Sequence, residues 1–279
     1  MKVKMANITA AEVNKLRQMT GAGMMDCKRA LVEAEGDFDK AIDILRKKGQ
    51  KVASKRADKE ANEGIVLAKT TDDNKFGAVV KISCETDFVA KNEEFVNFVN
   101  NIMDKILVEK PKDVATLNNL KLNDRTVAEN VTEMVGKTGE KMEVADYDYI
   151  ESESVSAYNH MGSKLATILG FNKKGFDDAG RQLAMQVAAM NPVAVNKDDV
   201  PQDVIDKEIE IGKDQARQEG KPEAILEKIA MGKLNKFFKE NTLLNQDFVR
   251  DSKMSVSQFL KETDTDLKVT GFKRLMLGA

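Results

Sequence analysis

Hydrophobic residues recur along the chain with two periods, which predict a mixture of strands and helices. The stretch Phe76–Cys84 is rich in β-branched residues and predicts a strand, paired as a hairpin with Gly64–Lys69 across a polar turn. After it, hydrophobic residues at helical spacing predict a helix that packs on this hairpin. They are Phe95, Val96, Phe98, Val99, Ile102, Met103 and Ile106.

A weaker copy of this pattern follows later in the chain. Val155–His160 and Lys164–Phe171 predict two strands around a short turn, and Leu183, Ala184 and Val187 mark the next helix. The stretch after Lys164 occupies the same place in its copy as the stretch after Lys75 in the first. The pattern therefore predicts an α+β fold with two related subdomains, each a small antiparallel sheet with helices on one face.

Three short helices are predicted before the first strand. Thr9 and Glu12 form a capping box, Met24–Ala34 carries the second helix, and Asp37 caps the third, which we expect to end at Gly49. Together they predict a small bundle that resembles a ubiquitin-associated domain.

The turn between the first two helices carries two adjacent methionines, Met24 and Met25. Methionine is flexible and polarizable, so a pair of them after a glycine turn suggests an adaptable contact surface. For either residue taken singly, the alternative is a side chain that faces the bundle core.

The segment Lys47–Lys59 is strongly basic, and two interpretations are open. It could bind phosphates, or it could form a solvated linker or helix face, which is more common. The rest of the chain adds no nucleic-acid motif, and the net charge of −2 gives no general attraction to nucleic acid or membranes. No apolar run is long enough to cross a membrane, and two isolated cysteines fit a reducing cytoplasm.

The segment Pro201–Glu240 changes character, with narrow hydrophobic stripes on either side of Gly220–Pro222. It predicts an antiparallel helical hairpin of coiled-coil type that protrudes from the rest of the chain. Beyond it, Ser255 opens another helix, and Lys268–Met276 predicts a strand that can join the second sheet.

The stretch Cys84–Lys91 lies where the first strand hands over to the Phe95 helix, and two interpretations are open. In one, Thr86 or Asp87 merely caps the helix by accepting bonds from its free N–H groups. In the other, Asp87 and Phe88 form an exposed acidic and aromatic tip that enters a partner, since an exposed Phe costs solubility unless something covers it.

Motifs for catalysis, cofactors or metals are absent from the sequence: there is no phosphate-binding glycine loop, CxxC pair or HExxH segment. A triad of Cys84, His160 and Asp87 is conceivable, because triad members need only meet in space. Nothing in the sequence marks Cys84 as activated, so we expect a protein that is not an enzyme and needs no cofactor.

Two stretches, Leu16–Lys28 and Cys84–Lys91, resemble the two signatures of translation elongation factor Ts. The resemblance spans nearly the whole chain and implies a guanine-nucleotide exchange factor that releases GDP from elongation factor Tu. One departure is that the chain stops at Ala279, so the C-terminal helical module of some members is expected to be missing.

The resemblance also implies roles for particular residues. Arg17, Met24 and Met25 would dock on the partner's GTPase domain, and His160 would face the partner from the second subdomain. The stretch Thr86–Val89 would displace the magnesium site, with Asp87 and Phe88 pushing in beside it. We expect partner-binding contacts from Thr86, Asp87, Phe88 and Val89.

The expected domain order is a three-helix domain, a two-part core and an inserted hairpin. The boundaries are 5–57 for the first domain, 58–150 for the first core subdomain, 151–200 with 241–279 for the second, and 201–240 for the hairpin. Two other functions stay open: an adaptor of the ubiquitin-associated type, drawn from the bundle alone, and a thiol hydrolase that uses Cys84.

Overall fold

The computed structural model describes residues 8–278, so the expected start of the first domain at Met5 lies outside the described part. Helices and antiparallel sheets are both present, as the predicted α+β class requires. The chain divides into two compact units, which we describe separately. The first holds the described residues up to Leu67, Val80–Tyr147 and the residues from Met276; the second holds Ala68–Val79 and Asp148–Leu275.

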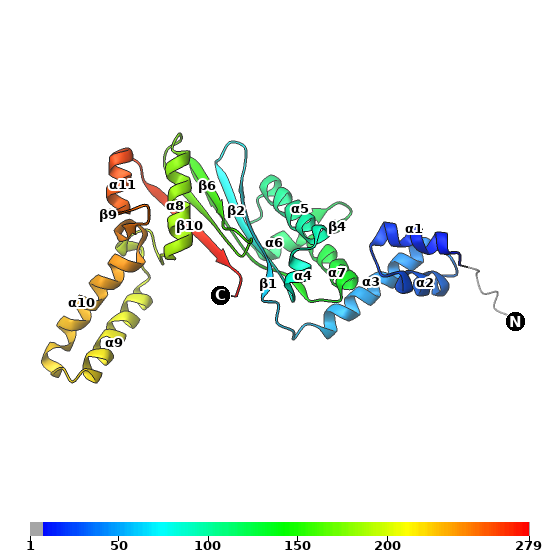
Figure 1. Ribbon diagram of the computed structural model, residues 1–279, viewed down its shortest axis with the longest axis horizontal. Coiled ribbons are helices and arrows are strands. Elements are labelled where there is room, and N and C mark those ends of the chain that lie inside the picture. Colours follow the sequence, from blue (N-terminus) through cyan, green and yellow to red (C-terminus); the bar gives the residue numbers. More distant parts are fainter. Residues whose placement is uncertain (1–7, 279) are drawn as a thin grey trace. The chain divides into compact units, whose positions relative to one another are not determined.

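Three helices at the start of the chain form a bundle with its own hydrophobic core (Figure 1). The predicted capping box is confirmed: Thr9 Oγ1 accepts a bond from Glu12 N, and the Glu12 carboxylate accepts one from Thr9 N. Asp37 caps the third helix as predicted. The helices are α1 (Ala10–Thr20), α2 (Met24–Glu33) and α3 (Phe38–Lys55), and their buried side chains include Val13, Leu16, Cys27, Ala30, Leu31 and Ala41.

The expected end of the third helix at Gly49 is wrong, because α3 continues to Lys55. Gly49 does not end the helix but allows α3 to approach α7 (Val127–Thr138) closely. A Cβ atom at Gly49 would lie 3.0 Å from the carbonyl oxygen of Thr132 and 3.5 Å from Cα of Gly136. Most of the basic segment that begins at Lys47 is therefore a helix face.

The first sheet has the strand order β1, β2, β5. The predicted hairpin of β1 and β2 is confirmed, and its turn is closed by a bond from Thr71 N to Phe76 O at 2.9 Å. The third strand, β5, is missing from the elements expected from the sequence. The strands are β1 (Glu63–Thr70), β2 (Phe76–Cys84) and β5 (Met142–Glu151).

The helices of the first unit include α5 (Glu93–Glu109), whose hydrophobic face is buried as the helical spacing predicts, except that Val96 is only half-buried. Its buried side chains are Phe95, Phe98, Val99, Ile102, Met103 and Ile106. The other elements of this part are α4 (Asp87–Ala90), α6 (Val114–Asn119), β3 (Lys121–Leu122), β4 (Arg125–Thr126) and α7.

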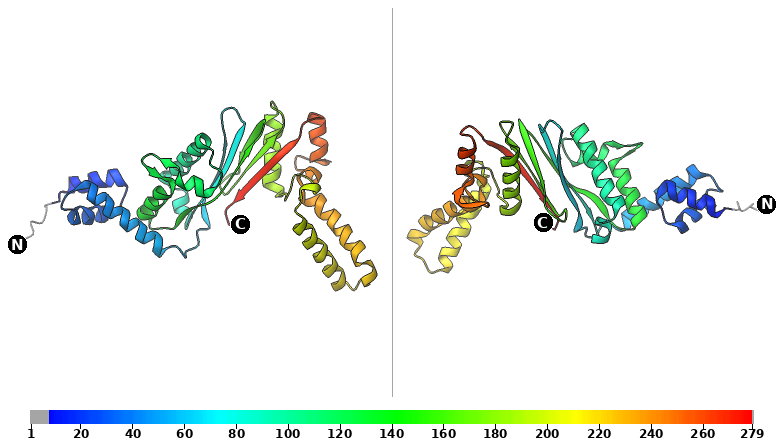
Figure 2. Two further views of the ribbon diagram at one scale, coloured as in Figure 1. Left: turned by 180° about the vertical axis from the view of Figure 1, so that it is seen from behind. Right: turned by 45° about the horizontal axis from the view of Figure 1, so that its top comes forward.

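The second sheet, in the second unit, has the strand order β10, β7, β6. The strands β6 and β7 are antiparallel, with Ser154 opposite Phe171 and Asn159 opposite Ala166. The strand expected near the C-terminus is confirmed as β10, which pairs with β7. Figure 2 shows α8 packed along this sheet. The elements are β6 (Ser154–Asn159), β7 (Leu165–Phe171), α8 (Asp177–Met190) and β10 (Val269–Met276).

Two long helices, which follow α8 in the chain, lie side by side as an antiparallel pair (Figure 1). They are α9 (Gln202–Gln218) and α10 (Glu223–Asn241), joined where Gly220 adopts a left-handed conformation. The predicted cap at Ser255 is confirmed. The remaining elements are η1 (Lys197–Asp199), η2 (Leu243–Asn245), β8 (Asp247–Phe248), β9 (Asp251–Ser255) and α11 (Val256–Thr263).

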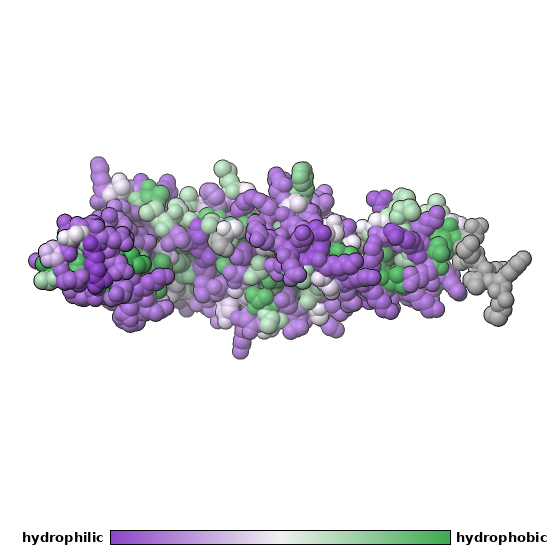
Figure 3. Space-filling model, turned by 90° about the horizontal axis from the view of Figure 1, so that it is seen from below, coloured by the Kyte–Doolittle hydropathy of each residue, from purple (hydrophilic) through white to green (hydrophobic). Residues whose placement is uncertain are grey.

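The surface offers few large hydrophobic areas on the face drawn in Figure 3, where hydrophobic residues form small separate patches among hydrophilic ones. Within residues 8–278, no helix has both the length and the apolar character needed to cross a membrane. The same residues hold no group of three or more His, Cys, Asp or Glu side chains that could bind a metal ion.

Candidate functional site

The stretch Thr86–Val89, which we call the tip, follows directly after β2 and forms the start of the one-turn helix α4. Thr86 is the cap residue, and its side-chain oxygen accepts a bond from Val89 N at 3.4 Å. The choice left open between Thr86 and Asp87 as cap is thus settled for Thr86. Phe88 is 83% exposed, so the tip presents an aromatic side chain to solvent.

The expected direct passage from the tip into the Phe95 helix is wrong. The helix α4 ends at Ala90, and α5 begins at Glu93 with its own cap, Asn92, whose Oδ1 accepts a bond from Glu94 N at 2.8 Å. The helical hydrogen-bond pattern is thus interrupted between Ala90 and Glu93, so α4 is not the first turn of α5. The tip is a separate structural element.

Two glutamates hold the base of the tip. The carboxylate of Glu140 accepts bonds from Thr86 N at 3.0 Å and from Thr86 Oγ1 at 2.7 Å. Glu85 accepts a two-pronged bond from the Arg56 guanidinium at 2.6 and 2.7 Å, and a third bond from Lys141 N at 2.5 Å. Charge-assisted bonds of this kind are shorter and stronger than neutral ones.

The electrostatics of this cluster favour the ionised form of Glu85. The hydrogen bonds from Arg56 hold the pKa of the Glu85 carboxyl below its usual value, against the opposing effect of desolvation. The side chain of Glu85 is only 14% exposed, which keeps the pair with Arg56 partly shielded from solvent screening. Glu85 and Arg56 are therefore a charged pair at physiological pH.

Asp87 contributes charge to the tip. Its carboxylate pairs at 2.7 Å with Nζ of Lys91, the residue that follows α4 one helical turn further on. The hydrogen bond and the charge of Asp87 raise the pKa of the Lys91 ammonium. The side chain of Asp87 is nearly half exposed, so solvent screens its pair with Lys91.

Cys84 has the properties of a structural thiol. Its side chain is fully buried at the end of β2, and its Sγ–H group donates a bond to Thr86 O at 3.2 Å. Burial, together with the negative charge of Glu140, raises the pKa of the Cys84 thiol to about 12. A thiolate is the reactive form of cysteine, so this environment opposes the thiol-hydrolase alternative.

The three bundle residues singled out in the sequence are all exposed. Met24 is 54% and Met25 is 64% exposed, so the alternative that either faces the bundle core is wrong. Arg17 is exposed in the last turn of α1, where its carbonyl oxygen accepts a bond from Gly21 N. Met19, which the sequence reasoning missed, is a further exposed methionine of this helix.

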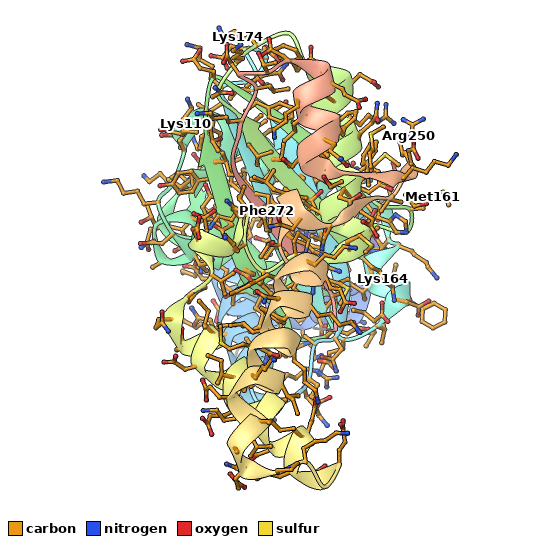
Figure 4. The ribbon with its side chains drawn as sticks, turned by 90° about the vertical axis from the view of Figure 1, so that its left-hand side faces the viewer. Lys110, Met161, Lys164, Lys174, Arg250 and Phe272 are labelled. Atoms are coloured by element: carbon orange, nitrogen blue, oxygen red, sulfur yellow. The ribbon has the colours of Figure 1, made fainter. Side chains whose placement is uncertain are left out.

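His160 lies in the second unit, at the turn between β6 and β7. The hydroxyl of Tyr158 lies 2.9 Å from its Nδ1, and the backbone N of His160 donates to Leu165 O. The next residue, Met161, is 89% exposed and lies at the outer edge of the view in Figure 4, a position that the sequence reasoning also missed. Figure 4 also shows Lys164, the last residue of the turn before β7.

The side chain of Asn159, just before this turn, is held by backbone groups from elsewhere in the second unit. The Asn159 amide accepts a bond from Ala68 N at 2.7 Å and donates one to Ala68 O at 2.9 Å. It thus acts as a substitute backbone partner for β1. This pairing fixes the residue that immediately precedes His160.

Comparison with known proteins gives a consistent result. A family model described as Elongation factor TS matches residues 85–279, a range that includes the tip. A protein named Elongation factor Ts from Flavobacterium psychrophilum is 51% identical over 282 residues, covering 98% of this chain and 100% of that relative. The chain belongs to the elongation factor Ts family.

Other relatives agree with this membership. Elongation factor Ts of Porphyromonas gingivalis is 50% identical over 273 residues, covering 98% of this chain and 99% of the relative. That of Bacteroides fragilis is 41% identical over 329 residues, with 98% and 99% covered. The resemblance carried by the two sequence stretches is confirmed, and with it a role in translation elongation.

Proposed function

We propose that the protein is a guanine-nucleotide exchange factor that binds elongation factor Tu and promotes GDP release during translation elongation. The observation that carries this proposal is the tip: Phe88 stands 83% exposed on an element whose base is held by charge-assisted hydrogen bonds. An exposed aromatic residue on a fixed base can enter a pocket of another protein without first losing conformational freedom.

The proposed mechanism needs no bond-making group. GDP leaves a GTPase slowly because contacts to both the phosphates and Mg²⁺ must break. A protein that binds the nucleotide-free GTPase more tightly must weaken nucleotide binding by the same factor. The tip would act as a wedge that disturbs the magnesium and phosphate site, and the factor would itself remain unchanged, so it is not an enzyme in the usual sense.

The residues take distinct roles in this proposal. Thr86, Asp87, Phe88 and Val89 would form the wedge, with Phe88 as its apolar body and Asp87 as its charge. In the bundle, Arg17, Met24 and Met25 would dock on the GTPase domain, since exposed methionines fit shallow apolar pockets. His160 would face the partner from the second unit. These assignments combine observed exposure with the family's implied roles.

We also propose the domain division stated from the sequence. It comprises a three-helix domain of ubiquitin-associated type (5–57), two related core subdomains (58–150, and 151–200 with 241–279) and an inserted hairpin (201–240). Direct binding to nucleic acid or membranes, and any cofactor, have no part in this proposal. The place of action is the cytoplasm, where elongation takes place.

The test is the release of labelled GDP from elongation factor Tu with and without this protein. We expect catalytic amounts to accelerate release in excess unlabelled GDP. An unchanged release rate, with a protein that is folded by circular dichroism, would exclude the exchange function. Calorimetry of a variant in which Arg17, Met24 and Met25 are all changed to Ala then examines the bundle: it should bind elongation factor Tu more weakly and stay folded, because all three side chains are exposed.

A further inference from the structure

The tip lacks a hydrophobic core of its own. The helix α4 has only four residues, and none of them is buried. A single helical turn is unstable in isolation, because too few hydrogen bonds offset the entropy lost on ordering the backbone. The conformation of the tip therefore has to be imposed by contacts outside it.

Glu140 supplies two of those contacts. Its carboxylate accepts a hydrogen bond from the backbone N–H of Thr86, which fixes the extended conformation of the cap residue. It also accepts a hydrogen bond from the hydroxyl group of Thr86. A hydroxyl has one proton and two lone pairs. With the proton committed to Glu140, the lone pairs are left for the N–H of Val89, which closes the turn that presents Phe88.

Arg56 supplies the contact on the other side of Thr86. Its guanidinium donates two hydrogen bonds to the carboxylate of Glu85, the residue immediately before the cap. The same carboxylate accepts a hydrogen bond from Lys141 N. Consecutive residues 85 and 86 thus face consecutive residues 141 and 140. Gly139, in a left-handed conformation, ends α7 immediately before Glu140.

We infer that Glu140 and Arg56 are positioning residues for the tip: they hold Thr86 and Glu85 so that α4 forms and Phe88 is presented in one conformation. The inference rests on the proposed exchange function and goes beyond it, because neither residue belongs to the wedge or the bundle contacts. Each acts through the tip. Removing either side chain therefore slows nucleotide exchange only to the extent that Phe88 loses its single conformation.

The main experiment compares Glu140→Gln with a matched control, Glu143→Gln. Glu143 lies three residues along, and within the described part of the chain its carboxylate makes one long ion pair, with Lys141 Nζ at 3.7 Å. The probe is elongation factor Tu loaded with fluorescently labelled GDP, at limiting concentrations of the factor. We expect Glu140→Gln to slow catalysed release about tenfold and Glu143→Gln to leave it within about twofold, using the equivalence of about 1.4 kcal/mol per decade.

Two further measurements separate positioning from simple structural damage. In a Phe88→Ala background, Glu140→Gln should lower the rate by less than about twofold, because residues that act through one another are not additive. Hydrogen exchange of the peptide that contains Thr86 and Val89 should accelerate in Glu140→Gln, with the melting temperature close to that of the unaltered protein.

The outcomes are distinct. Equal slowing by Glu140→Gln with and without Phe88→Ala, or equal rates for Glu140→Gln and Glu143→Gln, overturns the inference. If Glu140→Gln does not fold, Arg56→Lys serves in its place, since it keeps the charge and loses the fork; normal exchange and normal protection of the tip in that variant also overturn it. If the unaltered protein does not accelerate GDP release, the proposed function fails, while the protection of Thr86 and Val89 still reports on the positioning.

Discussion

Truncation of Phe88 is the most direct test of the proposed wedge, and its magnitude follows from exposure. A Phe side chain offers about 200 Å² of surface. At 83% exposure, complete insertion into a partner would bury about 170 Å² more, worth about 4 kcal/mol at about 25 cal/mol per Å². Alanine keeps part of that area, and binding orders the partner, so about 2 kcal/mol is expected to be lost. That loss corresponds to a ten- to hundredfold slower release of GDP at about 1.4 kcal/mol per decade.

The same exposure predicts little effect on the fold. A mostly exposed side chain contributes few packing contacts. The free energy of unfolding of Phe88→Ala should therefore lie within about 0.5 kcal/mol of that of the unaltered protein. Asp87→Ala should slow release less than Phe88→Ala, and the double variant should be less than additive because the two residues adjoin. The matched control is Val108→Ala, which removes an exposed hydrophobic side chain from the end of α5 and should leave release unchanged.

The assay is stopped-flow release of labelled GDP from elongation factor Tu, with thermal melts of each variant. Slow release together with a normal melt supports the wedge. A lowered melting temperature with normal exchange would mean that Phe88 is only a structural residue of the turn. Normal release and a normal melt in Phe88→Ala would refute the wedge mechanism, although membership of the family would stand.

The geometry supports four further predictions. Cys84→Ser should keep exchange within about tenfold, because burial leaves Cys84 almost entirely as the neutral thiol at pH 7; a larger loss in a folded variant would revive a role for the thiol. Gly232→Ala should raise the free energy of unfolding by about 0.5–1 kcal/mol, since a Cβ there meets nothing within 4 Å. Gly49→Ala should lower the free energy of unfolding, because the added Cβ would lie 3.0 Å from the carbonyl oxygen of Thr132; thermal melts that show the same sign for both variants would contradict this packing. Replacing α9 and α10 by a short Gly/Ser link should leave the remainder folded by circular dichroism, because loop length affects stability only slowly, and loss of the cooperative transition would argue against the proposed domain map. The pKa of Glu85 is lowered in the folded state, so its contribution to stability is present above the pKa of the unfolded state and is lost as pH falls through the folded value; the difference in melting temperature between the unaltered protein and Glu85→Gln should therefore be larger at pH 7 than at pH 3, and an equal difference would count against the pair with Arg56.

Elements with a strong local pattern could be predicted from the sequence. The hydrophobic spacing after Phe95 matched the buried face of α5, and the β-branched run from Phe76 matched β2. Capping residues such as Thr9 and Ser255 act within three residues of their partners, so their signal is local. Two local signals were overlooked: the alternating hydrophobic positions of β5, and the capping box of Thr126 that opens α7.

Features that depend on distant contacts could not be predicted in this way. Gly49 looks like a helix stop in sequence, and only its approach to Thr132 explains why a glycine stands inside the helix. The exposure of Met24 and Met25 depends on which side of α2 the rest of the bundle covers. Sequence periodicity describes one element at a time, so it does not reveal which elements meet.

The same limit applies to the candidate site. The tip itself was recognisable from Thr86–Val89, because an aromatic residue follows a cap and an acid. Its anchors were not: Glu140 is 54 residues away from Thr86, and Arg56 is 29 residues away from Glu85. A glutamate after a helix and an arginine in a basic segment are common, and neither carries a pattern that points to a partner so far along the chain.

An exposed aromatic side chain has to satisfy two opposing requirements. It must stay exposed in the free protein, although contact with other hydrophobic side chains of the same protein would be favourable. It must also reach a partner without a large loss of conformational entropy. The hydrogen bonds that Thr86 donates to Glu140 and that Glu85 accepts from Arg56 meet both requirements, because they restrict the chain at the base of the tip and do not need Phe88 to be buried. A hydrophobic anchor would instead favour burial of Phe88 against it, so polar contacts are the physically suitable way to keep this side chain exposed.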